Sequence, residues 1–398
     1  MKNFKKLSAL VLAGAMVFSL AACGGGSNET PAPETTAPAE SGAPAETTPA
    51  TDMKVAMITD YGDITDQSFN QTTYEACNEF CTANSVKFTY YKPAGDSTAE
   101  RVAMVDAAAA EGYNVVVIVM PGYAFADTIK ETAEMYPDIT FIALDVGEGD
   151  LGADYTVPSN VYCAVYQEEL CGYMAGYAAV KLGYTHLGFL GGMAVPAVQR
   201  YGYGFVQGAD AAAAELGNGD DVTVEYVYGN QFFGDADITA YMDNWYQTLG
   251  VEVVFACGGG IFTSATEAAA KVGGKVIGVD VDQAAIIDAY GEGMTVTSAM
   301  KGLANTTKHL LQETMDGNFA NYGGKIETLG LVSGDDPTAN YVQLPMESTQ
   351  WSDSFTQDNY KELVAAMFDG TITVSNDVTV EPAANATVIT VNAYENIK

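Results

Sequence analysis

The stretch VAMITDYGDITDQSFNQTTYEACNEFCTAN, residues 55–84, begins with a short apolar run and continues with the spacing of an amphipathic helix. The run VAMIT predicts a buried strand, and the residues from Asp66 onward predict a helix. The turn between them holds Asp60 and Asp63. A strand that leads through a short turn into a helix is the repeating unit of a parallel α/β sheet.

The same alternation of strand and helix continues along the chain. We expect further strands at 87–91, 115–120, 139–144, 186–190, 222–228, 251–257, 275–280 and 295–300. The helices expected between and after them cover 97–112, 123–135, 165–182, 196–216, 236–249, 261–272 and 301–316. Short apolar runs separated by helices predict two doubly wound α/β lobes, whose ligands bind beyond the carboxyl ends of the strands.

The first 52 residues are expected to lie outside the fold. Residues 1–22 have a positive start and an apolar run too short for a membrane span, which is typical of a signal peptide. The sequence Leu-Ala-Ala-Cys that ends at Cys23 resembles a bacterial lipobox, which implies lipidation of Cys23; simple cleavage after Ala22 is the alternative. Residues 23–52 are rich in Pro, Thr and Gly and predict a disordered tether.

The remaining residues divide into two lobes and a tail. The first lobe is expected to comprise 53–164 and 297–325, and the second 165–296 and 326–370. The last segment, 371–398, contains alternating apolar residues and is expected to be β-rich.

Composition and motifs exclude several functions. The formal net charge is −34 at pH 7, which disfavours nucleic acid as a partner and favours a neutral or cationic ligand, although acidity also serves solubility. The odd number of cysteines after Cys23 does not suggest a disulfide framework, and Cys77 and Cys81 are expected to be small buried residues. No P-loop, dinucleotide fingerprint or zinc motif occurs, and the two histidines, His186 and His309, are far apart in sequence. We therefore expect no cofactor, no metal and no catalytic residue.

Five pieces of the sequence resemble the basic membrane protein family, also called PnrA-like lipoproteins. They are VAMITDYGDITDQSFNQ (55–71), FIALD (141–145), GYGFVQGAD (202–210), VIGVDVDQ (276–283) and TSAMKG (297–302). The resemblance implies an α/β, periplasmic-binding-protein-like fold of type I, with two lobes joined by a multi-strand hinge. It also implies an extracytoplasmic, lipid-anchored, substrate-binding protein of an ABC importer, with a nucleoside as ligand and an ABC permease as partner.

In the first lobe, the resemblance implies ligand contacts for Asp60, Phe69, Asn70 and Asp145. Asp60 and Asp145 each end a predicted strand, and their alternative roles are an Asx-turn and loop solvation. The alternative for Phe69 is a hydrophobic staple with Ile64, in a helix capped by Thr65. Asp63 and Asp66 are expected to be turn and cap residues.

In the second lobe, Asp280 is expected to accept hydrogen bonds from ribose hydroxyls, with Asp282 as the less favoured neighbour. The resemblance gives Lys301 a bond to the ligand or to an acid; otherwise it is simply exposed. Phe232 and Phe233 follow a strand and are candidates for a second stacking ring, for which Trp245 and Tyr123 are substitutes. Cys257-Gly258-Gly259-Gly260 is either a ligand-facing loop or only a tight turn.

These residues predict a non-enzymatic, membrane-anchored binding protein that captures a nucleoside, with a purine nucleoside expected. The same fold with riboflavin or a sugar as ligand is the nearest alternative. Alternatives of another class are a nucleoside-cleaving enzyme, because Asp63 and Asp66 form a pair of acids, and a surface adhesin or sensor.

Overall fold

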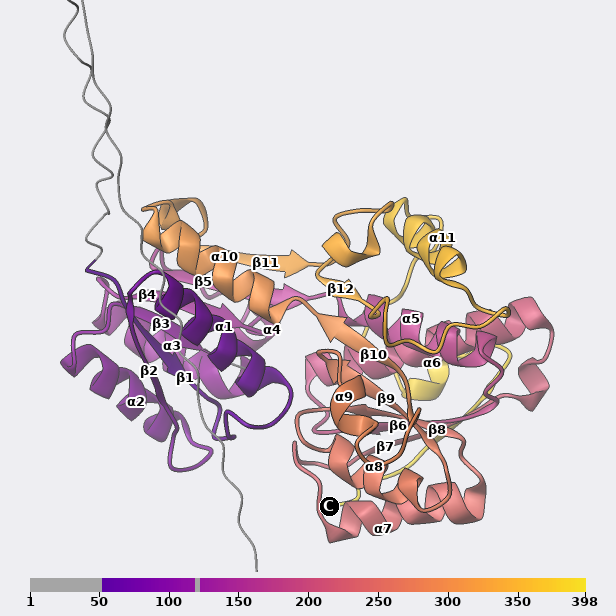
Figure 1. Ribbon diagram of the computed structural model, residues 1–398. Helices are drawn as coiled ribbons and strands as arrows, with labels where there is room; N and C mark the ends of the chain where they lie inside the picture. The colour runs from indigo at the N-terminus through magenta and orange to yellow at the C-terminus, as the bar shows by residue number, and fades with distance from the viewer. Residues whose placement is uncertain (1–51, 119–121) are drawn as a thin grey trace, which may run out of the picture. The chain divides into compact units, whose positions relative to one another are not determined.

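Two sheets organise the part of the chain that the computed structural model describes, residues 52–118 and 122–398 (Figure 1). The first sheet has the order β11-β5-β4-β3-β1-β2. Its strands are β1 (Lys54–Ile58), β2 (Lys87–Tyr91), β3 (Val115–Ile118), β4 (Thr140–Leu144), β5 (Val161–Tyr166) and β11 (Lys325–Leu329). All its pairings are parallel, as short apolar strands separated by helices predict.

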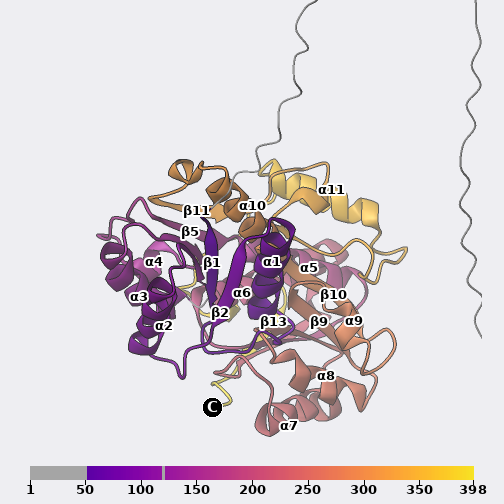
Figure 2. The same cartoon turned by 60° about the vertical axis from the view of Figure 1, so that its left-hand side comes forward.

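Helices cover both faces of the first sheet (Figure 2). They are α1 (Phe69–Ala83), α2 (Thr98–Ala110), α3 (Gly122–Met135), α4 (Glu148–Leu151) and α10 (Leu303–Met315). Alternate β1 residues point to opposite faces: Val55 and Met57 join the core that contains α1 and α10, whereas Ala56 and Ile58 join the core beneath α2 and α3. The apolar run of β1 is therefore fully buried.

The second sheet has the order β12-β10-β9-β8-β6-β7-β13, and only its β10–β12 pair is antiparallel. Its strands are β6 (His186–Gly191), β7 (Thr223–Tyr228), β8 (Val253–Cys257), β9 (Lys275–Asp280), β10 (Thr295–Lys301), β12 (Val342–Gln343) and β13 (Thr390–Ala393). Its helices are α5 (Glu168–Lys181), α6 (Pro196–Leu216), α7 (Ala236–Asn244), α8 (Phe262–Ala270), α9 (Ala284–Ile287) and α11 (Gln357–Phe368). A π-helical turn, Trp245–Leu249, extends α7.

Helices α5 and α6 lie in backbone contact because glycines occupy their crossing. A Cβ on Gly172 would lie 2.2 Å from the Tyr201 carbonyl oxygen, and one on Gly204 would lie 2.1 Å from the Glu169 carbonyl oxygen. Gly204 and Gly208 belong to the sequence GYGFVQGAD, and both serve the packing of α6 on α5. This contact places the first turn of α5 against the first turns of α6.

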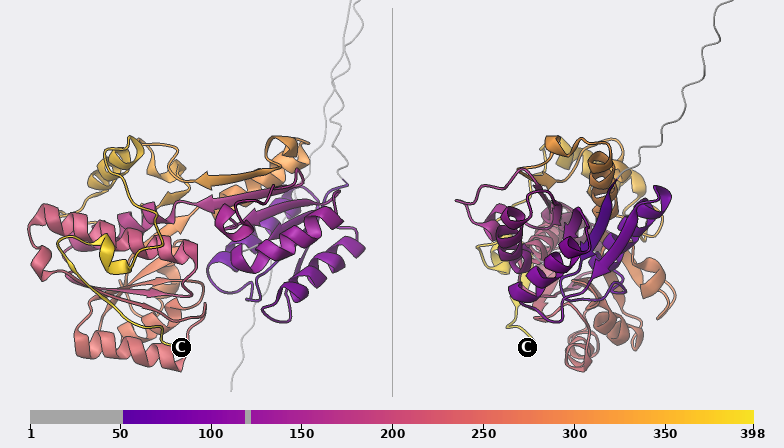
Figure 3. Two further views of the ribbon diagram at one scale, coloured as in Figure 1. Left: turned by 180° about the vertical axis from the view of Figure 1, so that it is seen from behind. Right: turned by 90° about the vertical axis from the view of Figure 1, so that its left-hand side faces the viewer.

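Three chain crossings join the two lobes, and the connecting strands run side by side in Figures 1 and 3. The chain passes from β5 to α5, from β10 to α10, and from β11 to β12. Main-chain hydrogen bonds tie the crossings together, from Gln167 N to Leu329 O at 3.0 Å and from Gly302 N to Tyr341 O at 2.7 Å. The sequence predicts the last two crossings near 297 and 325; the strand pairing continues through Lys301 and Leu329 because these bonds extend each strand.

The segment 371–398 contains one strand, β13, which pairs in parallel with β7 at the edge of the second sheet. The rest of the segment has no further strand, so the expectation of a β-rich tail is wrong for most of its length. Its yellow course along the second lobe is visible in Figure 3. It is held largely by side-chain contacts, such as those of Asp210 with the main-chain N–H groups of Thr387, Val388 and Ile389.

The predicted signal peptide, the predicted lipidation site Cys23 and all of the predicted tether except Asp52 lie outside the described residues. Within the described part of the chain, every helix is too short or too polar to span a bilayer. The five cysteines that are described are buried and unpaired, which agrees with the expectation that Cys77 and Cys81 are small core residues.

Candidate functional site

A cavity of about 410 Å³ lies where the carboxyl ends of strands from both sheets meet. Its wall from the first lobe is the turn after β1 together with the first residues of α1. Its wall from the second lobe comes from the start of α6, the turns after β7 and β8, and the ends of β9 and β10. Of the predicted residues, Asp60, Phe69, Asn70, Phe232, Phe233, Asp280 and Lys301 line this cavity.

The Asp60 carboxylate is held by its own turn. Its Oδ1 atom accepts hydrogen bonds from the N–H groups of Tyr61 and Gly62, at 2.7 and 2.5 Å, and from Asn70 Nδ2 at 3.2 Å. Burial raises the pKa of Asp60, although these donors oppose the rise. The Asx-turn and the cavity-facing position, which the sequence left as alternatives, occur together in the same residue.

Helix α1 begins at Phe69, and Asp66 rather than Thr65 supplies the cap. The Asp66 carboxylate accepts hydrogen bonds from the N–H groups of Ser68, Asn70 and Gln71, each at 3.0 Å. The staple that requires Thr65 as N-cap is therefore wrong, because the N-cap position is Ser68 and the Asp66 carboxylate binds the free N–H groups of the first turn. Asp63 is the other turn residue, and its ion pair with Lys92 is exposed.

The Asn70 amide has one fixed orientation. Its Nδ2 atom donates to Asp60 Oδ1 at 3.2 Å and to Asp66 Oδ2 at 3.0 Å. Both acceptors are carboxylates, so the nitrogen must face them. The Asn70 Oδ1 atom has no hydrogen-bond partner among the described residues.

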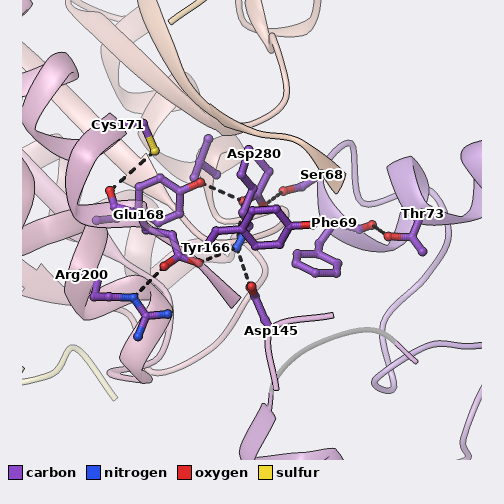
Figure 4. Close-up of polar contacts among 12 residues, drawn as sticks. Ser68, Phe69, Thr73, Asp145, Tyr166, Glu168, Cys171, Arg200 and Asp280 are labelled. Atoms are coloured by element: carbon purple, nitrogen blue, oxygen red, sulfur yellow. Dashed lines mark hydrogen bonds and ion pairs between the residues drawn. The ribbon is translucent and has the colours of Figure 1, made fainter. Parts of the chain in front are cut away.

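Lys301, at the end of β10, is fully buried and is surrounded by acids. Its Nζ atom lies 2.5 Å from Asp145 Oδ2, 3.3 Å from Glu168 Oε1 and 3.7 Å from Asp280 Oδ1. Burial alone would lower the pKa of Lys301, but the three carboxylates raise it above its ordinary value. The ammonium group is therefore positively charged. Figure 4 shows the three acids, Asp145, Glu168 and Asp280, with their side chains directed toward one region.

The same ammonium group faces aromatic rings. It lies 5.0 Å from the centre of the Phe69 ring and 5.5 Å from the centres of the Tyr166 and Tyr201 rings. Cation–π attraction at such distances stabilises a buried ammonium group. Lys301 thus forms part of the cavity wall and also supports Phe69, and the interpretation as a simply exposed lysine is wrong.

Asp145 lies behind the cavity wall rather than in it. Its backbone has a φ of 58°, a left-handed conformation that is uncommon for a residue other than glycine. Burial raises its pKa, against the opposing effect of Lys301. Asp145 does not line the cavity. In this structure its carboxylate forms an ion pair with Lys301 of the second lobe, and this pair joins the two lobes.

Asp280 ends β9 and also has a left-handed φ, of 65°. Its Oδ2 atom accepts a hydrogen bond from the Ser68 hydroxyl at 2.5 Å, and its Oδ1 atom accepts one from the Tyr201 hydroxyl at 3.4 Å. Ser68 belongs to the first lobe and Asp280 to the second, so this carboxylate is shared between the lobes. Asp282, the less favoured candidate, is outside the cavity and binds Ser348 and the start of α9.

Phe232 and Phe233 both line the cavity, on the side opposite to the first lobe. Phe232 packs against glycines: a Cβ on Gly192 would lie 2.5 Å from its ring, and one on Gly258 would lie 3.0 Å from it. Phe233 is 52% exposed. The closely packed Phe232 is therefore the better-positioned ring.

Neither substitute for the second ring is supported. Trp245 is 1% exposed and packs in the core beneath the second sheet, so it is wrong as a cavity residue. The side chain of Tyr123 lies outside the described residues.

Four residues that the sequence motifs did not identify, Glu168, Glu169, Arg200 and Tyr201, complete the polar site. Glu168 lies between Lys301 and Arg200, whose Nε atom is 2.7 Å from Glu168 Oε2. Glu169 is the next residue in the chain. Its pKa is raised to about 7, mainly by burial and to a smaller extent by the charge of Glu168. Tyr201 lines the cavity and reaches Asp280. A Glu pair that opens a strongly apolar helix was the available signal.

The two histidines make local contacts away from the cavity, His186 with Glu225 and His309 with the Tyr322 hydroxyl. Among residues 52–118 and 122–398, no group of three His, Cys, Asp or Glu side chains is arranged to hold a metal ion. The arrangement of the cavity suits the binding of a polar, flat ligand between two lobes.

A family model described as "ABC transporter substrate-binding protein PnrA-like" matches residues 53–361. The ABC transporter nucleoside-binding protein BmpA of Lactococcus lactis subsp. cremoris is 28% identical over 342 residues, which cover 81% of this chain and 89% of that protein. Basic membrane protein B of Borreliella burgdorferi is 26% identical over 289 residues, which cover 71% and 79%.

Solved structures show the same fold. A solute-binding protein of an ABC transporter system from Aeropyrum pernix superposes with a TM-score of 0.61 at 21% identity, and covers 82% of this chain and 88% of that chain. Another from Conexibacter woesei has a TM-score of 0.62 at 22% identity, with coverage of 81% and 99%. At these identities the likeness shows the fold alone, which is the two-lobed α/β fold of periplasmic-type binding proteins.

Proposed function

Because the chain belongs to the PnrA-like family of ABC transporter substrate-binding proteins, we propose that it binds a nucleoside, and specifically a purine nucleoside, between its two lobes. The observation that carries the proposal is the pairing in one cavity of aromatic rings from opposite lobes, Phe69 and Phe232, with carboxylates from both, Asp60 and Asp280. The rings suit the two faces of a base, and a carboxylate suits vicinal hydroxyls.

Each wall has a separate task in this proposal. Asp60 and Asn70, fixed by the turn after β1, bind polar atoms of the base. Asp280 accepts hydrogen bonds from ribose hydroxyls, and Lys301, whose Nζ atom lies 3.7 Å from Asp280 Oδ1, helps to orient that carboxylate. A ligand without hydroxyls would leave the buried Asp280 oxygens with fewer donors, which disfavours free bases.

The charges of the cavity disfavour phosphorylated ligands. Four acids line it, Asp60, Asp63, Asp66 and Asp280, whereas Lys301 is its only cationic wall residue within the described part of the chain. Lys301 already contacts three carboxylates. A nucleotide would therefore bring a phosphate group toward like charge without a free cation to pair with it.

The role in transport follows from the family. We propose that the protein is anchored to the extracytoplasmic face of the membrane through lipid on Cys23 and delivers its nucleoside to an ABC permease. The sequence that precedes Cys23 supports the anchor, and the family supports the permease. No bond of the ligand is broken in this role.

Thermal unfolding of the purified protein against a ligand panel tests the proposal. The panel contains inosine, guanosine, adenosine, uridine, inosine monophosphate, hypoxanthine, ribose and riboflavin. A ligand at 100 times its dissociation constant adds about 2.7 kcal/mol of apparent stability. We expect a shift with purine nucleosides and none with hypoxanthine or the nucleotide.

Other outcomes of the panel assign other functions. A shift with riboflavin or ribose alone would overturn the nucleoside assignment and leave the substrate-binding role. If chromatography detects free hypoxanthine released from inosine, the protein is a nucleoside-cleaving enzyme. An absence of any shift would favour a sensor or adhesin that binds another protein.

A further inference from the structure

Besides the ion pair between Lys301 and Asp145, two side-chain hydrogen bonds join the lobes beside the cavity. The Ser68 hydroxyl donates to Asp280 Oδ2 at 2.5 Å, and Gln283 Nε2 donates to the Gln67 carbonyl oxygen at 3.0 Å. Gln67 and Ser68 precede α1 in the first lobe, whereas Asp280 and Gln283 lie at the end of β9 and just after it in the second. Ser68, Gln67 and Gln283 are not part of the cavity wall. We call these four residues the clasp.

The second-lobe half of the clasp is rigid. Gln283 is fully buried, its Oε1 atom accepts from Val279 N at 3.0 Å, and its own N–H donates to the Ser298 hydroxyl at 3.1 Å. Gly278 makes room for it, since a Cβ there would lie 2.9 Å from Gln283 Cβ. With Oε1 fixed, the amide plane is fixed as well, and one of the two Nε2 N–H groups donates to the other lobe.

The first-lobe half is shaped to receive it. Gln67 has a left-handed φ of 58°, which is uncommon for a residue with a side chain. Its N–H donates to Gln71 Oε1, and the N–H of Ser68 donates to Asp66, both at 3.0 Å. Residues held in sparsely populated backbone conformations persist where the surroundings require them. Here the turn directs the Gln67 carbonyl and the Ser68 hydroxyl toward the second lobe.

We propose that the clasp holds the two lobes closed and that Ser68 and Gln283 thereby set the rate at which the ligand leaves. The proposal rests on the proposed binding function for its ligand but not for its geometry. Both hydrogen bonds exist only when the lobes are together, so they stabilise the closed state over the open one. Apparent affinity is proportional to the fraction of protein in the binding-competent state, so it falls when the closed fraction falls.

The Ser68 hydroxyl also has a positioning role. It donates to Asp280 Oδ2 while Tyr201 donates to Oδ1, so the two hydroxyls together fix the orientation of this carboxylate in the cavity wall. Ser68 is therefore a residue that couples closure to the orientation of the predicted ribose acceptor, without contact with the ligand itself.

Two variants break the clasp in different ways. Gln283→Glu keeps an oxygen for Val279 N but replaces the interlobe donor with a second oxygen that faces the Gln67 carbonyl. Ser68→Ala removes the hydroxyl and nothing else. Gln350→Glu is the matched control, because Gln350 Nε2 also donates to a main-chain carbonyl, that of Gly293 at 3.0 Å, but within the second lobe.

The first measurement needs no ligand. Spin labels at Glu134→Cys and Val272→Cys, on exposed positions of the two lobes, report the interlobe distance in a Cys23→Ser background. The five described native cysteines are buried and are protected from labelling. We expect longer distances in Gln283→Glu and Ser68→Ala, and an unchanged distribution in Gln350→Glu.

The second measurement is stopped-flow dissociation of inosine. Loss of one hydrogen bond of this kind is expected to raise the dissociation rate constant about threefold to tenfold, with the association rate constant nearly unchanged. A merely structural role would lower stability in all three variants without this division. If inosine does not bind the wild-type protein, the proposed function fails while the distance measurement still decides the clasp. Unchanged distances in both clasp variants would overturn the clasp whatever the ligand.

Discussion

Asp60 and Asp280 each follow or end a strand and line the same cavity, but they are held by different parts of the fold. Asp60 is held by neighbours within ten residues, Tyr61, Gly62 and Asn70. Asp280 is held by side chains 212 and 79 residues away, those of Ser68 and Tyr201. The first wall is therefore formed by a local turn, whereas the second is completed only when helices pack and the lobes meet.

The largest effect is expected from removing the positive charge of Lys301, which lies beside Asp280. Lys301→Met would leave Asp145, Glu168 and Asp280 buried without their shared cation. We expect a loss of about 3–5 kcal/mol in the free energy of unfolding, measured by urea denaturation, together with loss of inosine binding.

Lys308→Met is the control, because its pair with Glu79 is exposed and contributes at most about 1 kcal/mol. Similar losses in both variants would contradict the buried network.

A pH titration tests the buried acids that support the second wall. Glu169 lies against Glu168, and its pKa is raised from 4.5 to about 7, mainly by burial. A carboxyl whose folded pKa is raised contributes stability below pH 4.5, and this stability is lost as the pH rises to about 7. Glu169→Gln should therefore increase the free energy of unfolding at about pH 8 by up to about 3 kcal/mol and change little at about pH 4. An equal gain at both pH values would exclude titration as the cause.

The two acids themselves provide the next test. Asp280→Asn introduces an N–H₂ group where Ser68, Tyr201 and Lys301 all direct donors, so inosine affinity should fall by about 10- to 150-fold. Asp60→Asn retains an oxygen for the two main-chain N–H groups, and we expect a loss below about tenfold. Isothermal titration calorimetry measures both. A larger loss in Asp60→Asn would reverse the assignment of the ribose to the second lobe.

The aromatic rings of the second wall differ in packing and should differ in effect. Phe232→Ala should weaken inosine binding by about 1–3 kcal/mol through the lost stacking. Phe233→Ala, at a side chain that is 52% exposed, should change binding by less than about 0.5 kcal/mol. Both are measured by calorimetry, and the opposite order would assign the stacking face to Phe233.

The smallest effect is expected at Asp63. Its pair with Lys92 is exposed, although Asp63 lines the cavity. Asp63→Asn should change neither the free energy of unfolding nor inosine affinity by more than about 0.5 kcal/mol. A tenfold loss of affinity would make Asp63 a ligand contact rather than a turn residue.

The difference between the walls also explains what the sequence could predict. Carboxyl ends of parallel strands meet at one edge, so the strand pattern alone predicts that Asp60, Asp280 and Lys301 lie at the cavity. Their roles toward a ligand stay predictions. Glu168 and Tyr201 lie on helices whose inward faces are defined only by the α5–α6 crossing, and nothing in the local sequence identifies the glycines as its cause.

The local sequence predicted the wrong N-cap for α1 because two adjacent residues could both cap the helix. Thr65 and Asp66 both have cap chemistry, and the carboxylate satisfies three N–H groups where a hydroxyl satisfies one. The pattern predicts the correct strand end for Asp145, but the direction of its side chain depends on Lys301, which is 156 residues away. Side-chain direction, which is set by residues far away in the sequence, therefore limits the prediction of the site.

The glycine crossing of α5 and α6 has a consequence for protein engineering. Replacing a helical glycine with alanine is a standard route to higher thermostability, because alanine favours the helix. At Gly172 or Gly204 the added methyl group would meet a carbonyl oxygen of the neighbouring helix at 2.2 or 2.1 Å. The helices would have to separate, and Glu168, Arg200 and Tyr201 would move with them. A change outside the cavity wall would thus act on Lys301 and Asp280, so a stabilisation library that includes these positions would also select on ligand binding.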